Sequence, residues 1–163
     1  MEQKLILISG SPYVGKTTIC EKLYQKLDNS AYLDGDWVCH FNPFSVKDPR
    51  VREVEITNAS FVISTYLKMK FKYVFFSSVI LTDKNIREKI ITKIDAKNFK
   101  TIGFTLMCSE ETLSKRHKKR GGKNEVSYHW LRLETYPGDI VIDTDNKKVR
   151  QIVDEIKNTI YEI

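Results

Sequence analysis

The sequence predicts an α/β fold in which helices cover both faces of a parallel sheet. Five short apolar segments alternate along the 163 residues with segments of helical periodicity. The apolar segments are nearly continuous runs, as in strands that are buried on both faces. A turn with two glycines, residues 10–17, joins the first strand to the first helix. Because ligands of such folds bind beyond the carboxyl ends of the strands, functional side chains are expected just after each strand.

The strands are predicted from composition, since each is short, apolar and rich in β-branched or aromatic residues. The second and the last are the shortest, and the third is strongly aromatic. Their expected ranges are 5–9, 31–34, 72–80, 101–108 and 139–143.

The helices are predicted from apolar residues that recur every three or four positions. Ile19, Leu23 and Leu27 mark one face of a helix over 17–27, and an irregular stripe marks a longer helix over 50–69. Either Thr82 or Asp83 can cap the third helix, and Ser109 can cap the fourth. The apolar stripes of the third and fifth helices are Ile86, Ile90, Ile91 and Ile94, and Val149, Ile152, Val153, Ile156 and Ile160.

Length and composition indicate one domain over residues 1–163, with 41% hydrophobic and 29% charged residues. The net charge of +6 favours anionic ligands, which include both nucleotides and nucleic acid. Cys20, Cys39 and Cys108 fit no zinc pattern and are expected to be free, buried thiols. No apolar run reaches the roughly 18–20 residues that span a bilayer, and no signal peptide is evident. We therefore expect a cytoplasmic protein with no membrane partner.

The turn "GSPYVGKT", Gly10 to Thr17, fits the pattern G-x-x-x-x-G-K-[ST] between a strand and a helix. Glycines let several backbone N–H groups point into one concavity, and the following helix N-terminus adds positive potential. Lys16 can reach the β- and γ-phosphates, and the Thr17 hydroxyl can bind Mg²⁺. The expected ligands are ATP and Mg²⁺. The residues expected to bind the nucleotide are Gly10, Ser11, Tyr13, Val14, Gly15, Lys16, Thr17 and Thr18.

Asp34 and Asp36 follow the second strand in "YLDGDW". In this architecture they lie beside the phosphate loop, where one carboxylate can hold a Mg²⁺-bound water and the other can accept a proton from a substrate hydroxyl. A solvated Asp-Gly-Asp turn is the alternative. Asp34 is the expected metal residue together with Thr17, and both carboxylates are expected to be catalytic.

Arg116 and Arg120 lie four residues apart in "TLSKRHKKRGGK" and are expected to share a helix face. Followed by two glycines, they suit a lid over 115–130 that closes on the triphosphate and neutralises developing charge. Arg132 could add a further contact. A solvated basic helix face and a nucleic-acid patch are the alternatives.

With these elements the chain resembles the small P-loop kinases, a group that includes gluconate, shikimate and adenylylsulfate kinases and chloramphenicol phosphotransferase. "GSPYVGKTT" and "YLDGDW" are most similar to the gluconate and adenylylsulfate kinases. "SEETLSKR" and the segments around it look closer to bacterial AAA-domain or nucleotide kinase-like proteins.

The resemblance implies a three-layer P-loop NTPase fold with a five-stranded sheet of order 2-3-1-4-5. By position, Lys16 and Thr17 match the phosphate and Mg²⁺ residues, and Arg116 and Arg120 match the lid arginines. The third strand lacks the acidic residue that P-loop NTPases carry there, which makes Asp34 a substitute for holding Mg²⁺. Asp143 is expected to be structural, and residues 144–147 are expected to edge the base.

The acceptor is expected to bind along residues 37–70, because aromatic side chains and arginines gather after the second strand. Aromatic rings can stack on sugars or bases, and arginines can bind a carboxylate or phosphate. The candidate acceptor residues are Trp37, His40, Phe44, Arg50 and Arg132.

These observations favour an ATP- and Mg²⁺-dependent phosphotransferase acting on a hydroxyl of a small molecule. A nucleoside or nucleotide kinase is the first alternative. A nucleotide-triggered module that binds RNA or protein is the second, and nucleic acid is the less favoured partner. Acceptor and oligomeric state stay open.

Overall fold

The computed structural model describes residues 2–45 and 47–163. Five parallel strands form one sheet in the order β2-β3-β1-β4-β5, with β1 (Gln3–Gly10) at its centre. The other strands are β2 (Ser30–Asp34), β3 (Tyr73–Ser77), β4 (Phe99–Met107) and β5 (Ile140–Asp143). The expected α/β sheet and its strand order are confirmed. Val46, inside the expected acceptor segment 37–70, and Met1 lie outside the described residues.

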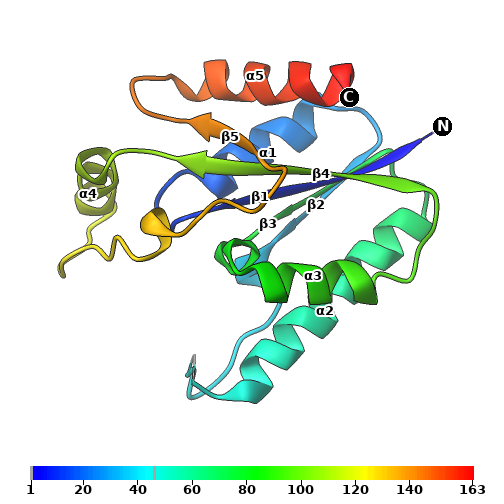
Figure 1. The fold of residues 1–163 in the computed structure, drawn as a ribbon, viewed down its shortest axis with the longest axis horizontal. Coiled ribbons are helices and arrows are strands. Elements are labelled where there is room, and N and C mark those ends of the chain that lie inside the picture. The colour runs from blue at the N-terminus through cyan, green and yellow to red at the C-terminus, as the bar shows by residue number, and fades with distance from the viewer. Residues whose placement is uncertain (1, 46) are drawn as a thin grey trace.

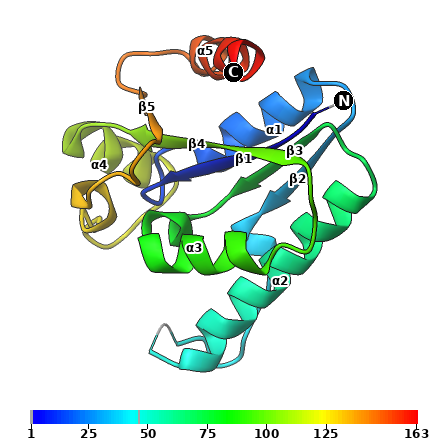
Figure 2. The same cartoon turned by 45° about the vertical axis from the view of Figure 1, so that its right-hand side comes forward.

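Helices cover both faces of the sheet and make three layers (Figure 1). One face carries α1 and α5, and the other carries α2 and α3, as the turned view confirms (Figure 2). α4 lies at the end of the sheet where β4 finishes. The bounds are α1 Lys16–Lys26, α2 Pro49–Lys68, α3 Lys84–Lys93, α4 Glu110–Lys119 and α5 Val149–Glu162, with short 3₁₀ turns η1 Gly35–Trp37, η2 Val79–Thr82 and η3 Trp130–Arg132.

The side chains of β1 divide between two hydrophobic cores. Ile6 and Ile8 belong to the core beneath α1 and α5, whereas Leu5 and Leu7 belong to the core beneath α2 and α3. All four are completely buried, which explains why this strand is a continuous apolar run rather than an alternating one. The glycine-rich turn after β1 therefore leaves the middle of a fixed sheet.

Most element bounds lie within one or two residues of the expected ones, and the largest difference is at the third strand. The third strand ends at Ser77 instead of 80, because the Ser78 hydroxyl accepts a hydrogen bond from Ile80 N (3.3 Å) and starts η2. Asp83, and not Thr82, caps α3 by accepting from Ile86 N (3.1 Å). The expected Ser109 cap of α4 is confirmed, with Thr112 N as its donor (3.2 Å).

The three cysteines are free, but only two are buried as expected. Cys20 and Cys108 lie in the core beneath α1, and burial raises the pKa of both thiols. Cys39 is half-buried because its loop after η1 lies at the molecular surface. No helix among residues 2–45 and 47–163 has the length and apolar character needed to cross a membrane.

A buried ion pair ties α3 to the start of β5. The Arg87 guanidinium makes two bonds to the Asp139 carboxylate, at 2.7 and 2.8 Å, and both side chains are at most 3% exposed. Thr105 on β4 donates to the same carboxylate (2.7 Å), and the guanidinium packs on the ring of Tyr136. Gly103 lies directly against this pair, where a Cβ would collide with both partners.

Replacing Arg87 with Met should lower the free energy of unfolding by about 3–5 kcal/mol, because it leaves the Asp139 carboxylate buried without its partner. Urea denaturation measures the change. Asp154→Asn is the matched control, since Asp154 is 45% exposed where it pairs with Lys26. Its cost should stay below about 1 kcal/mol. Equal losses for the two variants would contradict this interpretation.

Candidate active site

The turn after β1 adopts a conformation that needs its glycines. Gly10 and Gly15 have φ values of 139° and 111°, and Tyr13 between them has a φ of 67°. At Gly10 a Cβ would also lie 2.6 Å from the carbonyl oxygen of Leu106 on β4. Backbone of this shape is open to glycine and strained for other residues. The loop therefore curls tightly.

The N-terminus of α1 completes a place for an anion. Gly15 is the N-cap residue and no side chain caps the helix, so the first-turn N–H groups have no side-chain partner. Ser11, within the loop, has a buried hydroxyl without a hydrogen-bond partner among the described residues. Uncapped N–H groups and the helix dipole together favour a phosphate at this point.

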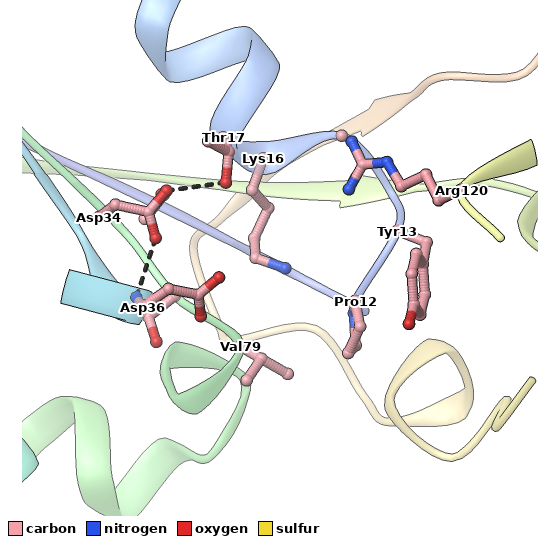
Figure 3. A pocket seen from close by; sticks show the side chains of 11 residues that line it. Pro12, Tyr13, Lys16, Thr17, Asp34, Asp36, Val79 and Arg120 are labelled. Atoms are coloured by element: carbon pink, nitrogen blue, oxygen red, sulfur yellow. Dashed lines mark hydrogen bonds between the residues drawn. The ribbon is translucent and has the colours of Figure 1, made fainter. Parts of the chain in front are cut away.

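A cavity of about 240 Å³ opens beside the loop (Figure 3). It lies at the carboxyl ends of β1, β2 and β3, as the fold class predicts. The lining residues are Pro12, Tyr13, Gly15, Lys16, Thr17, Asp34, Asp36, Ser77, Ser78, Val79 and Arg120. Six of the expected catalytic, metal-binding and nucleotide-binding side chains thus meet here: Tyr13, Lys16, Thr17, Asp34, Asp36 and Arg120. Gly10, Ser11, Val14 and Thr18 do not belong to this lining.

The Lys16 amine lies at the cavity, and its pKa is lowered. Its Nζ donates to the carbonyl oxygens of Gly10 and Ser11, both at 2.9 Å. Burial lowers the pKa of the amine to about 8, although the nearby carboxylates of Asp36 and Asp34 act in the opposite direction. The amine therefore carries its proton weakly and gains from any further negative charge placed next to it.

Asp34 is held by three hydrogen bonds. Its Oδ2 accepts from Thr17 Oγ1 and from the Tyr32 hydroxyl, each at 2.7 Å, and its Oδ1 accepts from Asp36 N at 2.9 Å. The bond to Thr17 joins β2 to the first turn of α1 (Figure 3). Asp34 is thus fixed next to the hydroxyl that the loop motif assigns to a metal ion.

Asp36 differs from Asp34 in its surroundings. Its side chain is exposed, and among the described residues its carboxylate accepts no hydrogen bond. Figure 3 shows this carboxylate facing the Lys16 amine across the cavity. Asp34 is therefore a constrained carboxylate and Asp36 an accessible one.

Arg116 and Arg120, the two arginines expected in the lid, have different surroundings. Arg116 donates to Val14 O and Thr144 Oγ1, both at 2.9 Å, and to Thr144 O at 3.1 Å, so it links the loop to the segment after β5. Arg120 lines the cavity. Arg120 is the C-cap residue of α4, one helical turn after Arg116, and its N–H donates to Arg116 O at 3.2 Å. Gly121, with a φ of 81°, then turns the chain away.

The five candidate acceptor residues do not line the cavity. Trp37 and Phe44 are 78% and 60% exposed, and His40 is exposed as well. Arg50 and Arg132 are each paired with a carboxylate at 2.6 Å, from Asp48 and Glu110 respectively. Their contact with an acceptor stays a prediction.

Ser77, Ser78 and Val79 border the cavity next to Asp36 and were not expected from the sequence. Ser77 ends β3, and Ser78 and Val79 directly follow it. The rule that points to strand ends missed them because the third strand was expected to run on to 80. Tyr32 was missed too. Its position two residues before Asp34 places both side chains on one face of β2, which was the available signal.

The donor atoms present suit a magnesium ion that comes with a nucleotide. In the part of the chain that the structure describes, no three His, Cys, Asp or Glu side chains cluster as a self-sufficient metal site. Thr17 and Asp34 supply two oxygen donors at the phosphate end of the cavity. Mg²⁺ usually takes one or two carboxylates together with substrate phosphates and water, which fits this set.

No family model and no curated protein sequence matches the chain. Solved structures do match over nearly its whole length. The Deinococcus radiodurans tunicamycin resistance protein has a TM-score of 0.76 at 18% identity, over 97% of this chain and 95% of that one. The Mycobacterium tuberculosis APS kinase, solved with AMPPNP and APS, has a TM-score of 0.71 at 15% identity, over 98% of each chain.

The Sinorhizobium meliloti gluconokinase has a TM-score of 0.67 at 15% identity, over 99% of this chain and 97% of that one. At such identities a match shows the fold and leaves activity open. The chain has the three-layer fold of the P-loop kinases, which confirms the fold expected from the resemblance.

Nucleotide binding should take up protons near pH 8, because a bound triphosphate favours the charged form of Lys16, whose pKa is about 8 in the free protein. Roughly half a proton per nucleotide is expected at that pH, and affinity should fall as the pH rises further. Calorimetry of AMPPNP binding in buffers of different ionisation enthalpy measures the uptake.

Lys16→Arg is the matched control, since a guanidinium stays charged throughout this range and should take up none. Binding by the unmodified protein without proton uptake would show that the Lys16 amine is already fully charged.

Proposed function

We propose that the chain is an ATP- and Mg²⁺-dependent phosphotransferase that moves the γ-phosphate of ATP to a hydroxyl of a small molecule. One observation carries the proposal: the phosphate loop shares its cavity with two carboxylates of opposite character, Asp34 constrained and Asp36 accessible. Transfer to an alcohol benefits from a carboxylate that is free to take the hydroxyl proton. The P-loop kinase fold supports the same class.

The triphosphate would lie along the loop. The N–H groups of the first turn of α1 would bind its oxygens, together with Lys16 and Arg120, the positively charged side chains of the cavity lining. Thr17 and Asp34 would hold Mg²⁺, which when bound neutralises part of the phosphate charge.

The transfer step needs one base and charge stabilisation. The acceptor oxygen forms a bond to the γ-phosphorus, the bond from that phosphorus to the bridging oxygen breaks, and ADP leaves with the electron pair. Asp36 accepts the hydroxyl proton as the new bond forms. Lys16 and Arg120 stabilise the negative charge on the transferred group.

The adenine of ATP and the acceptor molecule would bind on opposite sides of the loop. Arg116 lies in α4 and is bonded to Thr144 just after β5, so we place adenine beside residues 144–147. Ser77 ends β3, Ser78 follows it, and both line the cavity with Asp36, so we place the acceptor hydroxyl there. In the sheet order, β1 and β4 lie between β3 and β5 and separate the two sides.

A nucleoside or nucleotide kinase is the second candidate. Trp37 directly follows Asp36, the proposed proton acceptor, and its side chain is 78% exposed. An exposed indole at this position could stack on the base of an acceptor nucleoside. The first proposal and this one share the same chemistry and differ in the acceptor.

Phosphorus NMR with ATP, Mg²⁺ and a panel of polyols, sugars, nucleosides and nucleoside monophosphates tests both. We expect a new phosphoester signal with at least one class, and Asp36→Asn should lower kcat about 10²–10⁴-fold without weakening ATP binding.

Asp28→Asn, at an exposed position in the turn before β2, is the matched control and should keep full activity. Bound ATP with no product from any class, or an Asp36→Asn variant as active as the control, would refute the proposal.

A further inference from the structure

The strand next to the phosphate loop ends in a serine. Ser77 pairs in register with Ile8 of β1 on one side and with Asp34 of β2 on the other. The carboxylate that bonds to Thr17 therefore comes from β2, and the buried Ser77 lies between β2 and the loop strand. Because β3 lies between β2 and β1, a contact from β3 is needed to support the Asp34 carboxylate next to Thr17.

Tyr32 makes that connection. Its hydroxyl donates to Asp34 Oδ2 at 2.7 Å and lies 2.8 Å from Ser77 Oγ. A phenol has one proton, and the carboxylate has none to give, so the proton of Tyr32 goes to Asp34 and Ser77 donates to Tyr32. The bonds form a directed series from Ser77 through Tyr32 to Asp34, where Thr17 donates to the same oxygen.

The ring of Tyr32 is itself fixed. It stacks on Tyr24 of α1 with ring centroids 5.7 Å apart, and its backbone is paired with Phe75 in the sheet. The hydroxyl thus has one position relative to both the strand and the helix. Without it, Asp34 would keep the bonds from Thr17 and from Asp36 N, and its carboxylate would lose its only hydrogen bond from a sheet side chain among the described residues. The carboxylate is then less firmly held about its χ2 angle.

We infer that Tyr32 is a positioning residue: its hydroxyl, oriented by Ser77, holds Asp34 so that Asp34 and Thr17 together receive the divalent ion that accompanies the nucleotide. This inference rests on the proposed function in requiring such an ion. Lys16 and the loop N–H groups make no hydrogen bond to Tyr32. Loss of the Tyr32 hydroxyl should therefore reduce the gain in nucleotide affinity that the metal provides. The binding of the phosphates by Lys16 and the loop should not change.

The test compares AMPPNP affinity with Mn²⁺ and in EDTA, by calorimetry, for the full chain and for Tyr32→Phe. We expect the ratio of the two affinities to fall about 10-fold or more in Tyr32→Phe, as is typical when a group supporting a metal ligand is lost. Affinity in EDTA should not change. The electron paramagnetic resonance spectrum of the bound Mn²⁺ should also broaden, because its carboxylate ligand is less ordered.

Tyr24→Phe is the matched control, because it removes a hydroxyl from the other ring of the same stacked pair and should change neither affinity. Ser77→Ala is the second variant and keeps the test decisive if Tyr32→Phe folds poorly. It should lower the ratio as well, by leaving the Tyr32 hydroxyl unoriented.

A Tyr32→Phe or Ser77→Ala protein that keeps the full gain from Mn²⁺ would overturn the inference. So would equal weakening with Mn²⁺ and in EDTA, since that is the mark of a general structural defect. If the unmodified protein itself gains nothing from Mn²⁺, the proposed function fails together with the inference. The two failures are thus distinguishable.

Discussion

The parallel pairing of β1 with a strand on each side determines where every other functional group of this protein lies. The pairs Ile8–Ser77 and Gly10–Leu106 align the strand ends, and the β1 side chains from Leu5 to Ile8 are completely buried in two cores. A loop leaving this strand has no freedom of position. The ends of β2 and β3 then lie on one side of the loop and the end of β5 on the other.

This constraint explains how two aspartates one residue apart come to differ. Asp34 still belongs to β2 and is bonded to Thr17, Tyr32 and the backbone of Asp36. Asp36 lies in the 3₁₀ turn beyond the strand and turns its carboxylate to the cavity. One intervening glycine, Gly35, is enough to separate a held carboxylate from an accessible one. The proposed division between metal binding and proton transfer follows from that difference.

The sequence predicted those parts of the site that depend on local pattern or on the alignment of strand ends. The loop motif located Lys16 and Thr17, and the strand-end rule placed Asp34 and Asp36 beside them. Helical spacing placed the two arginines one turn apart but contains nothing about Thr144, which binds Arg116 outside the cavity lining. A tyrosine in a strand resembles an ordinary core residue. The role of Tyr32 depends on Ser77, a residue 45 positions away.

Backbone amide chemical shifts on addition of Mg·AMPPNP test most directly whether the turn after β1 binds a triphosphate. The largest changes should fall at residues 10–18 and at Asp36, whereas α3, which contributes no residue to the cavity lining, should not respond. A folded protein whose loop amides do not shift at millimolar Mg·AMPPNP would contradict the nucleotide site, and with it the proposed phosphotransfer.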